Sequence, residues 1–314
     1  MTGTVIKNTG SDYLVLADGS GERVPCKIKG KFRMQGIRTT NPVAVGDRVV
    51  FETAPDGTGI INAIEDRRNY IIRRASNLSK AASIIAANVD CAMLVATLVH
   101  PPTSLTFIDR FLASAEAYGV PAMLVINKAD LLADEPDDRE FLEAVLYLYR
   151  SIGYKAMAVS ARTGEGIDAL REELRGKTTL LSGNSGVGKS SLINALVPGL
   201  ELRTAAISEA NDSGMHTTTF SEMFDLPGGG RIIDTPGVRG FGTVEFEREQ
   251  VGHYFPEIFA ESAKCRFGNC THTHEPGCAV LEAVTDSRIA QSRYASYLSI
   301  LDECTAADKY RKPQ

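Results

Sequence analysis

The segment Gly183-Asn184-Ser185-Gly186-Val187-Gly188-Lys189-Ser190 matches the phosphate-loop pattern G-x-x-x-x-G-K-[ST] and is the strongest indication of the fold in this chain. An apolar run at residues 178–182 precedes it and an amphipathic run at residues 189–196 follows it, so we expect a strand, this loop and then a helix. Glycines let such a loop curl until its N–H groups point at phosphate oxygens, at the positive end of the helix. Lys189 is then expected to reach the β- and γ-phosphates and the Ser190 hydroxyl to ligate Mg²⁺, with Ser182 and Ser191 completing the site.

A second motif, Asn127-Lys128-Ala129-Asp130, follows an apolar run at residues 122–126. The Asp130 carboxylate can accept hydrogen bonds from guanine N1–H and the exocyclic amine, whereas adenine offers neither donor and would leave a desolvated carboxylate unpaired. We expect Asn127 to contact the other edge of the base and to brace the phosphate loop, and the Lys128 stem to cover the ring. Ser160-Ala161-Arg162, after the next expected strand, is typical of the loop whose backbone N–H meets guanine O6. The two motifs together predict a site for GTP rather than ATP.

Two further segments match the loops that sense the γ-phosphate. Asp234-Thr235-Pro236-Gly237 ends an expected strand at residues 231–234; we expect Asp234 to hold Mg²⁺ through water and the Gly237 N–H to meet the γ-phosphate. His216-Thr217-Thr218-Thr219 lies in a polar stretch, and one of its threonines, for which we favour Thr218, is expected to ligate Mg²⁺. The alternative for the threonine run is the start of a β-strand, since threonine favours strands.

The order of these motifs is unusual. In ordinary GTPases the phosphate loop comes first and the guanine motif late, whereas here positions 127 and 160 precede the loop at 183, and positions 216 and 234 follow it. All parts are present but cyclically rotated, and the same sheet can form if the original ends are joined, because domain termini often lie close together. The γ-phosphate loop therefore leads through residues 238–244 directly into the C-terminal part of the chain, a route by which nucleotide state could reach it.

The flanking regions predict two more domains. Residues 1–72 contain five short strand-like runs, at 3–7, 13–17, 23–28, 48–52 and 59–64, with hairpin signals at Asp18-Gly19 and Asp56-Gly57, which favours an oligonucleotide-binding (OB) type barrel or another small β-barrel. Residues 73–244 alternate strands and helices, which predicts a mainly parallel sheet covered by helices. Within them, the apolar run 84–99 is interpreted as a helix end followed by a buried strand. Residues 245–314 are expected to be helical around a cysteine and histidine cluster.

That cluster has the pattern Cys265-x₄-Cys270-x-His272-x₅-Cys278, with His274 as a spare imidazole. Three thiolates and one imidazole make a closed tetrahedral set suited to one structural Zn²⁺. Disulfides are disfavoured because nothing at the N-terminus resembles a secretory signal, so a reducing cytoplasmic location is expected. The remaining three cysteines are scattered along the chain.

Composition sets outer limits on function. No run approaches the roughly 18 charge-free apolar residues of a membrane span, and no lipidation or amphipathic anchor signal is visible, so we expect no membrane partner. Residues 1–74 carry 12 Lys or Arg and 8 Asp or Glu, a net charge of +4, although the whole chain is at −5. This asymmetry permits contact of the N-terminal region with RNA, while a solvated surface is the other reading.

The permuted motif order, the phrase Gly214-Met215-His216-Thr217-Thr218-Thr219, the run Leu226-Pro227-Gly228-Gly229-Gly230 and the terminal Cys/His cluster resemble the ribosome small-subunit-dependent GTPase A (RsgA) family over nearly the whole chain. The resemblance implies a circularly permuted P-loop GTPase domain, of α/β class, preceded by an OB-type barrel and followed by a helical zinc-binding domain that uses His272. It also implies a GTPase that acts late in small-subunit maturation, contacts ribosomal RNA and is stimulated by the ribosome. The expected partners are therefore GTP, GDP and the small ribosomal subunit with its rRNA, and we expect the protein to be a monomer.

Catalysis needs a helper that differs from the usual one. Many GTPases place a glutamine after the glycine of the γ-phosphate loop to orient the attacking water, but Val238 stands there and cannot do so. We therefore expect slow intrinsic hydrolysis, with Lys189 on the phosphates and His216 as the candidate that orients water; a structural role for His216 is the alternative. The competing function is a guanine-nucleotide-gated RNA-binding module with negligible hydrolysis.

Overall fold

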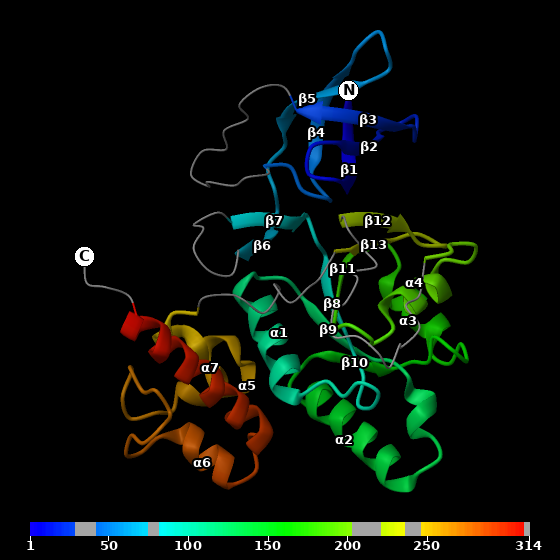
Figure 1. Cartoon of the computed structure of the whole chain (residues 1–314). Coiled ribbons are helices and arrows are strands. Elements are labelled where there is room, and N and C mark those ends of the chain that lie inside the picture. The colour runs from blue at the N-terminus through cyan, green and yellow to red at the C-terminus, as the bar shows by residue number, and fades with distance from the viewer. Residues whose placement is uncertain (29–41, 75–81, 203–220, 236–245, 311–314) are drawn as a thin grey trace.

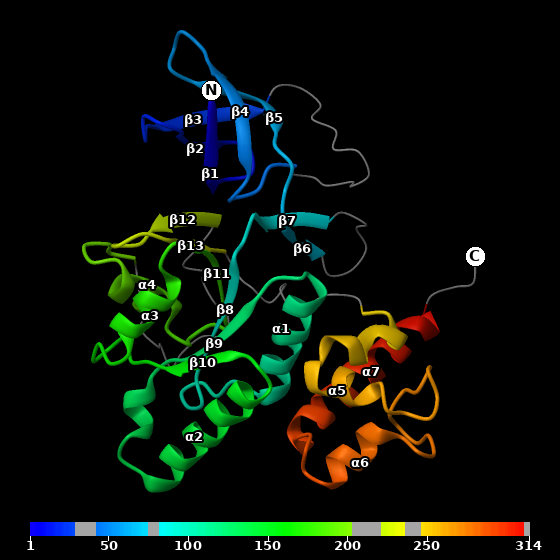
Figure 2. The same cartoon turned by 180° about the vertical axis from the view of Figure 1, so that it is seen from behind.

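A barrel, a helix-covered sheet and a helical module follow one another from the N-terminus to the C-terminus of the chain (Figure 1). The computed structural model describes residues 1–28, 42–74, 82–202, 221–235 and 246–310. In both views the barrel sits against one end of the sheet, while the helical module lies beside α1 (Figures 1 and 2).

The N-terminal barrel consists of β1 (Thr2–Asn8), β2 (Tyr13–Ala17), β3 (Arg23–Ile28), β4 (Arg48–Thr53) and β5 (Gly59–Ile64). The strands pair in the order β1-β2-β3-β5-β4, and β4 pairs back to β1, so the barrel is closed. Alternate residues of β2 point inward, as expected for strands with one buried face. Val5, Val15, Phe51 and Ile61 fill the interior. The predicted OB-type barrel is confirmed.

The central sheet has five parallel strands in the order β10-β9-β8-β11-β13. They are β8 (Cys91–Ala96), β9 (Ala122–Ile126), β10 (Lys155–Ala158), β11 (Thr178–Ser182) and β13 (Arg231–Asp234). Every residue of β8 is buried, because helices cover both faces of the sheet. The helices are α1 (Leu105–Ala117), α2 (Pro136–Ser151), α3 (Ile167–Leu174) and α4 (Lys189–Leu196). This is the predicted parallel α/β domain.

Local sequence signals mark the starts of α1 and α2. Ser104 caps α1, its hydroxyl accepting a hydrogen bond from the Phe107 N–H. α2 begins with a proline and has Asp137 and Asp138 in its first turn, where acidic groups favour the positive end of the helix dipole. Leu112 and Leu146 from these helices pack on one face of the sheet, and Leu170 and Leu192 from α3 and α4 pack on the other.

One sequence interpretation is wrong. Residues 82–87 form a strand, β7 (Ala82–Ala87), rather than a helix end, and pair with β6 (Tyr70–Arg74) in a separate two-stranded sheet. The sequence run is short and apolar, and such runs do not distinguish strand from helix. The non-local pairing decides the outcome, because Ala86 also makes a β-bridge to Val45.

Another strand that the sequence did not indicate joins the barrel to the sheet. β12 (Ser221–Asp225) runs antiparallel to β13 and pairs on its other side with β1 of the barrel. The two sheets thereby become one continuous sheet of 11 strands.

The C-terminal module contains η3 (Arg248–Tyr254), α5 (Pro256–Ser262), α6 (Ala279–Thr285) and α7 (Gln291–Tyr310). Phe255, Val280, Tyr297 and Leu301 form its core together with Ala113 of α1, so the module is packed onto the central domain. Among the described residues, no helix combines the length and apolar character needed to cross a membrane.

Candidate nucleotide site and metal cluster

The predicted nucleotide-binding motifs gather at one edge of the central sheet. Asn127 follows β9, Ser160 lies just beyond β10, Gly183 follows β11, and Asp234 ends β13. These strands are parallel, so their carboxyl ends share an edge, the usual place for a ligand in an open α/β sheet. The tertiary structure thus brings together segments that are more than 100 residues apart in the chain.

The phosphate loop links β11 to α4 and depends on its glycines. Gly186 and Gly188 have φ values of +83° and +88°, a region that disfavours side chains. A Cβ at Gly188 would also overlap the Asn127 amide. Lys189 begins α4, and its Nζ donates to the carbonyl oxygens of Gly183 and Asn184, each at 2.7 Å. The curled backbone and the lysine therefore face the same space.

Asn127 connects the guanine motif to the phosphate loop. Its side chain is 2% exposed. The Nδ2 group donates to the Val187 carbonyl oxygen at 2.9 Å, and Oδ1 accepts from the Ala161 N–H at 3.1 Å. One amide therefore holds three loops at fixed separations.

Lys128 makes a parallel connection. Its backbone is left-handed, with φ of 64°, and its Nζ donates to the Gly186 carbonyl oxygen at 2.8 Å and to that of His100. His100, in the loop after β8, was not singled out by sequence analysis, because nothing in its local sequence distinguishes it. Ala129 and Asp130 follow in the short helix η1 (Ala129–Leu132).

The Asp130 carboxylate is held by two neighbours. Ser160 Oγ donates to Oδ1 at 2.6 Å, and Arg162 Nε donates to Oδ2 at 2.8 Å. Burial opposes ionisation, but these two hydrogen bonds and the charge of Arg162 hold the pKa of Asp130 below its ordinary value. The carboxylate is therefore charged at neutral pH and acts only as an acceptor, as reading guanine requires. Sequence analysis included Arg162 in the Ser160-Ala161-Arg162 loop but gave it no role toward Asp130.

Asp234 lies on the phosphate side of the pocket. It is 4% exposed and is in register with Leu181 of β11, one residue before Ser182. Burial lowers the pKa of Lys189, and the nearby Asp234 charge opposes that effect. Asp234 near Lys189, and Ser190, which follows Lys189 in the first turn of α4, supply a carboxylate and a hydroxyl, oxygen ligands of the kind that Mg²⁺ prefers.

Several predicted site residues belong to segments that the structure does not describe. His216, Thr217, Thr218, Thr219, Gly237 and Val238, together with residues 239–244, lie outside the described residues.

The four predicted metal ligands come together in the C-terminal module. The ligand atoms of Cys265, Cys270, His272 and Cys278 all lie within 4.8 Å of one another. The Cys265 and Cys278 sulfurs are 3.9 Å apart, and His272 Nδ1 is 3.6 Å and 3.5 Å from them. Tetrahedral zinc with bonds of about 2.1–2.3 Å needs edges of roughly 3.5–3.8 Å. The cluster can hold a metal ion, and its donor set fits zinc.

The structure places His272, not His274, in the cluster. His274 is exposed, and its Nδ1 is engaged with the Thr273 hydroxyl at 2.8 Å. By contrast, Tyr294 of α7 donates its hydroxyl to the His272 carbonyl oxygen at 2.7 Å. Tyr297 does the same to Thr271, also at 2.7 Å. Sequence analysis missed these tyrosines, which fix the loop through its backbone.

A parallel sheet that carries a guanine motif before its phosphate loop, and a γ-phosphate aspartate after it, defines a circularly permuted GTPase. Family comparison agrees. The model for the RsgA GTPase matches residues 64–244, and the model for the RsgA N-terminal domain matches residues 2–61. The chain belongs to the RsgA GTPase family and is a GTP hydrolase.

Relatives resemble the chain along its full length. A protein of Bacteroides fragilis named small ribosomal subunit biogenesis GTPase RsgA is 61% identical over 311 residues, covering 99% of both chains. A protein of the same name from Porphyromonas gingivalis is 58% identical over 316 residues, again covering 99% of both. Among solved structures, YjeQ from Thermotoga maritima has a TM-score of 0.79 at 35% identity and covers 99% of both chains. YloQ, described as a circularly permuted GTPase, has a TM-score of 0.75 at 33% identity, covering 100% of this chain and 96% of its own.

Proposed function

We propose that this GTPase binds the small ribosomal subunit and acts in its late maturation, with hydrolysis stimulated by the ribosome. The observation that carries the nucleotide half is the Asn127 bridge, which joins the Asp130 motif to the phosphate loop in one pocket. The name of the 61% identical relative, which spans 99% of this chain, supports the ribosomal half. A cytoplasmic, monomeric protein fits this role.

Each residue of the pocket has a proposed task. Asp130 recognises guanine, and Ser160 with Arg162 holds Asp130 in place. Asn127 and Ala161 contact the other edge of the guanine base, and the Lys128 stem covers its ring. The loop from Ser182 to Ser191 receives the phosphates, with Lys189 on the β- and γ-phosphates. Ser190, Thr218 and Asp234 would hold Mg²⁺, which neutralises charge on the phosphates. Gly237 would meet the γ-phosphate.

We propose that His216 orients the water that attacks the γ-phosphate. Val238 cannot orient this water, whereas a histidine that directly precedes Thr217, Thr218 and Thr219 can accept a hydrogen bond or supply charge near neutral pH. His216→Ala should keep GTP binding near that of the original chain and lose turnover stimulated by small subunits. His274→Ala, an exposed histidine outside the pocket, is the matched control. Unchanged stimulated turnover in His216→Ala would refute the role.

The flanking domains are proposed to hold RNA and metal. We divide the chain into a barrel at 1–72, a GTPase domain at 73–244 and a zinc domain at 245–314. The positive N-terminal region supports contact with ribosomal RNA. In the zinc domain, the exposed Arg266 lies over the exposed ring of Phe267, 5.4 Å from its centroid, which suits contact with phosphate and base. Zinc at the Cys265 cluster would hold this loop.

The decisive experiment is co-sedimentation with isolated small subunits in GTP, a non-hydrolysable GTP analogue and GDP. We expect tighter binding with the analogue than with GDP. Phosphate release over many turnovers, with and without subunits, separates the enzyme from the alternative RNA-binding module. Release that subunits do not raise would support the module, and absence of nucleotide-dependent sedimentation would contradict the ribosomal role.

A further inference from the structure

A single rung of the sheet runs from the barrel to the nucleotide pocket. Lys7 of β1 is in register with Glu222 of β12, and Glu222 is in register with Asp234 of β13. Both pairings are antiparallel, so directly opposed side chains lie on the same face of the sheet, with Cβ atoms about 5 Å apart. The rung therefore lines up a barrel lysine, a glutamate of the connecting strand β12 and the aspartate beside the phosphate loop.

The rung contains one attractive pair of charges and one repulsive pair. Lys7 Nζ lies 3.0 Å from Glu222 Oε2. Glu222 and Asp234 are like charges directly opposite each other, an arrangement that destabilises a sheet unless one charge is neutralised. Lys7 supplies that neutralising charge, and on the far side Asp234 interacts with the Lys189 ammonium. The barrel thus contributes to the electrostatic setting of the phosphate pocket.

The barrel strand is shaped to make this contact. The register of β1 against β2 shifts between Val5 and Lys7, which places a bulge at Ile6. Bulges bend a strand and re-aim its side chains. Ile6 consequently packs into the core of the central domain, and Lys7 faces Glu222. The bulge allows one strand to serve both the barrel and the sheet edge.

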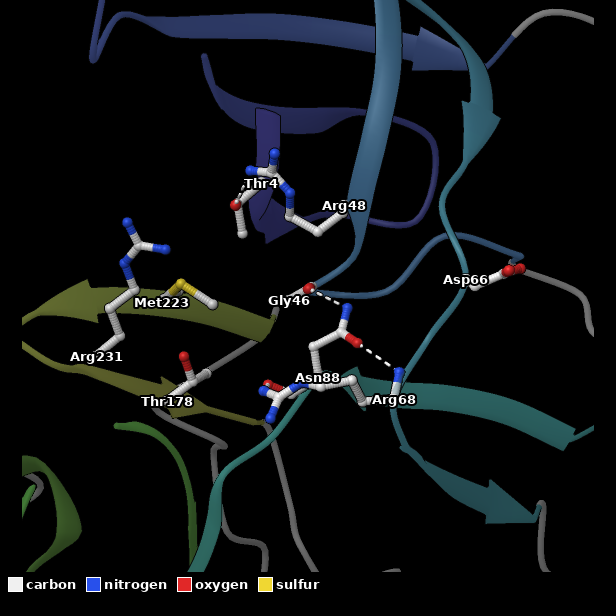
Figure 3. Close-up of a pocket in the computed structure, with 9 residues that line it drawn as sticks. All are labelled: Thr4, Gly46, Arg48, Asp66, Arg68, Asn88, Thr178, Met223 and Arg231. Atoms are coloured by element: carbon white, nitrogen blue, oxygen red, sulfur yellow. Dashed lines mark hydrogen bonds between the residues drawn. The ribbon is translucent and has the colours of Figure 1, made fainter. Parts of the chain in front are cut away.

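The contact is also narrow. β1 and β12 share two registered pairs, Lys7 with Glu222 and Asn8 with Ser221. Next to them lies a cavity of about 360 Å³ between the domains (Figure 3). Figure 3 shows Thr4 and Arg48 on the barrel side of this space and Met223 and Arg231 on the sheet side. Across the β1–β12 pairing, the Lys7–Glu222 ion pair adds to the strand hydrogen bonds and to the packing of Ile6 in the core of the central domain.

We propose that Lys7 and Glu222 are positioning residues for the nucleotide site. Through them, the contact between the barrel and β12 controls how strongly Asp234 retains Mg²⁺ and nucleotide. The proposal rests on the Mg²⁺ role of Asp234 given above. It makes the barrel, the domain suited to RNA, an electrostatic regulator of the site. When the barrel separates from β12, the positive charge of Lys7 leaves the rung. The negative charge of Glu222 is then no longer neutralised and adds to that of Asp234.

The test uses the full chain and the Mg²⁺ dependence of the dissociation rate of N-methylanthraniloyl-GDP. Lys7→Ala makes the rung more negative, so half-saturation should occur at a Mg²⁺ concentration about two- to fivefold lower. Glu222→Gln makes the rung more positive and should raise that concentration by a similar factor. The double variant should return close to the original value, Lys7→Arg should preserve it, and both single shifts should shrink at roughly 0.5 M salt.

The two single variants should shift the half-saturating Mg²⁺ concentration in opposite directions, which distinguishes an electrostatic positioning role from a general loss of structure. A merely structural loss would move Lys7→Ala and Glu222→Gln in the same direction and would not be repaired in the double variant; that result overturns the proposal. Unmoved Mg²⁺ dependence in both variants overturns it as well while leaving the GTPase assignment intact. Failure of the original chain to bind the GDP probe would instead contradict the proposed function itself.

Discussion

Arg293 of α7 and Asp109 of α1 form an ion pair inside the protein, with Nη1 and Oδ1 2.8 Å apart and side chains 1% and 0% exposed. Glu257 accepts two further hydrogen bonds from the same guanidinium, and Tyr149 of α2 donates to the same Asp109 oxygen. The pair therefore ties the zinc-cluster module directly to the central domain. This joint is independent of residues 236–245, through which the chain itself connects the two.

Arg293→Met should destabilise the protein strongly, because it leaves the Asp109 charge buried without its partner. Breaking a buried pair in this way costs about 3–5 kcal/mol. The measurement is urea unfolding followed by circular dichroism. Arg110→Ala is the matched control, since Arg110 pairs across the same interface with the exposed Glu303, and its loss should cost at most about 1 kcal/mol. Equal effects of the two substitutions would contradict a stabilising joint at Arg293.

Asp130→Asn should exchange the base preference of the pocket. The amide cannot accept from both guanine donors, but its N–H₂ can donate to the C2 carbonyl of xanthine. We expect GTP affinity to fall roughly 100-fold and xanthosine triphosphate to bind instead. Calorimetry with both nucleotides measures this, and Asp134→Asn, an exposed acid four residues away, should leave both affinities unchanged. Retained GTP affinity in Asp130→Asn would show that another residue reads the base.

His272→Ala should abolish stoichiometric zinc, because three thiolates do not complete a closed tetrahedral site. Elemental analysis of the purified protein is the measurement, and thermal unfolding should show loss of the cooperative C-terminal transition. His274→Ala should keep one zinc per chain, since its ring lies outside the cluster. Zinc lost equally from both variants would mean that the ligand set is different.

Acid should weaken the barrel through Asp18. Hydrogen bonds from Arg48 and Thr2 lower the pKa of Asp18 from 3.8 to about 2. A carboxyl whose pKa is depressed in the folded state adds stability above its unfolded pKa, and this stability is lost as pH falls from about 4 towards 2. In Arg48→Met the urea midpoint should therefore fall less steeply over that range than in the original chain. Parallel pH profiles would count against this source of stability.

Much of the fold followed from local sequence. The strands at Tyr13–Ala17 and Thr178–Ser182 and the helix at Lys189–Leu196 have the bounds expected from their patterns. Their periodicity, glycines and caps act within a few residues, so one segment carries the whole signal. The nucleotide motifs and the metal ligands were equally readable, because phosphate, guanine and zinc each demand particular residue types at close spacing.

Local sequence patterns were thus enough to predict the nucleotide and metal chemistry of this chain and the order of its domains. The charged pairs, by contrast, depend on the folded chain: Arg162 pairs with Asp130, Arg293 with Asp109, and Lys7 with Glu222, across 32, 184 and 215 positions. The tertiary structure also decided that residues 82–87 and 221–225 are strands. A charged side chain requires a partner and an apolar side chain requires a buried surface, and both requirements can be recognised in the sequence. Which partner or surface each side chain contacts depends on how the whole chain packs.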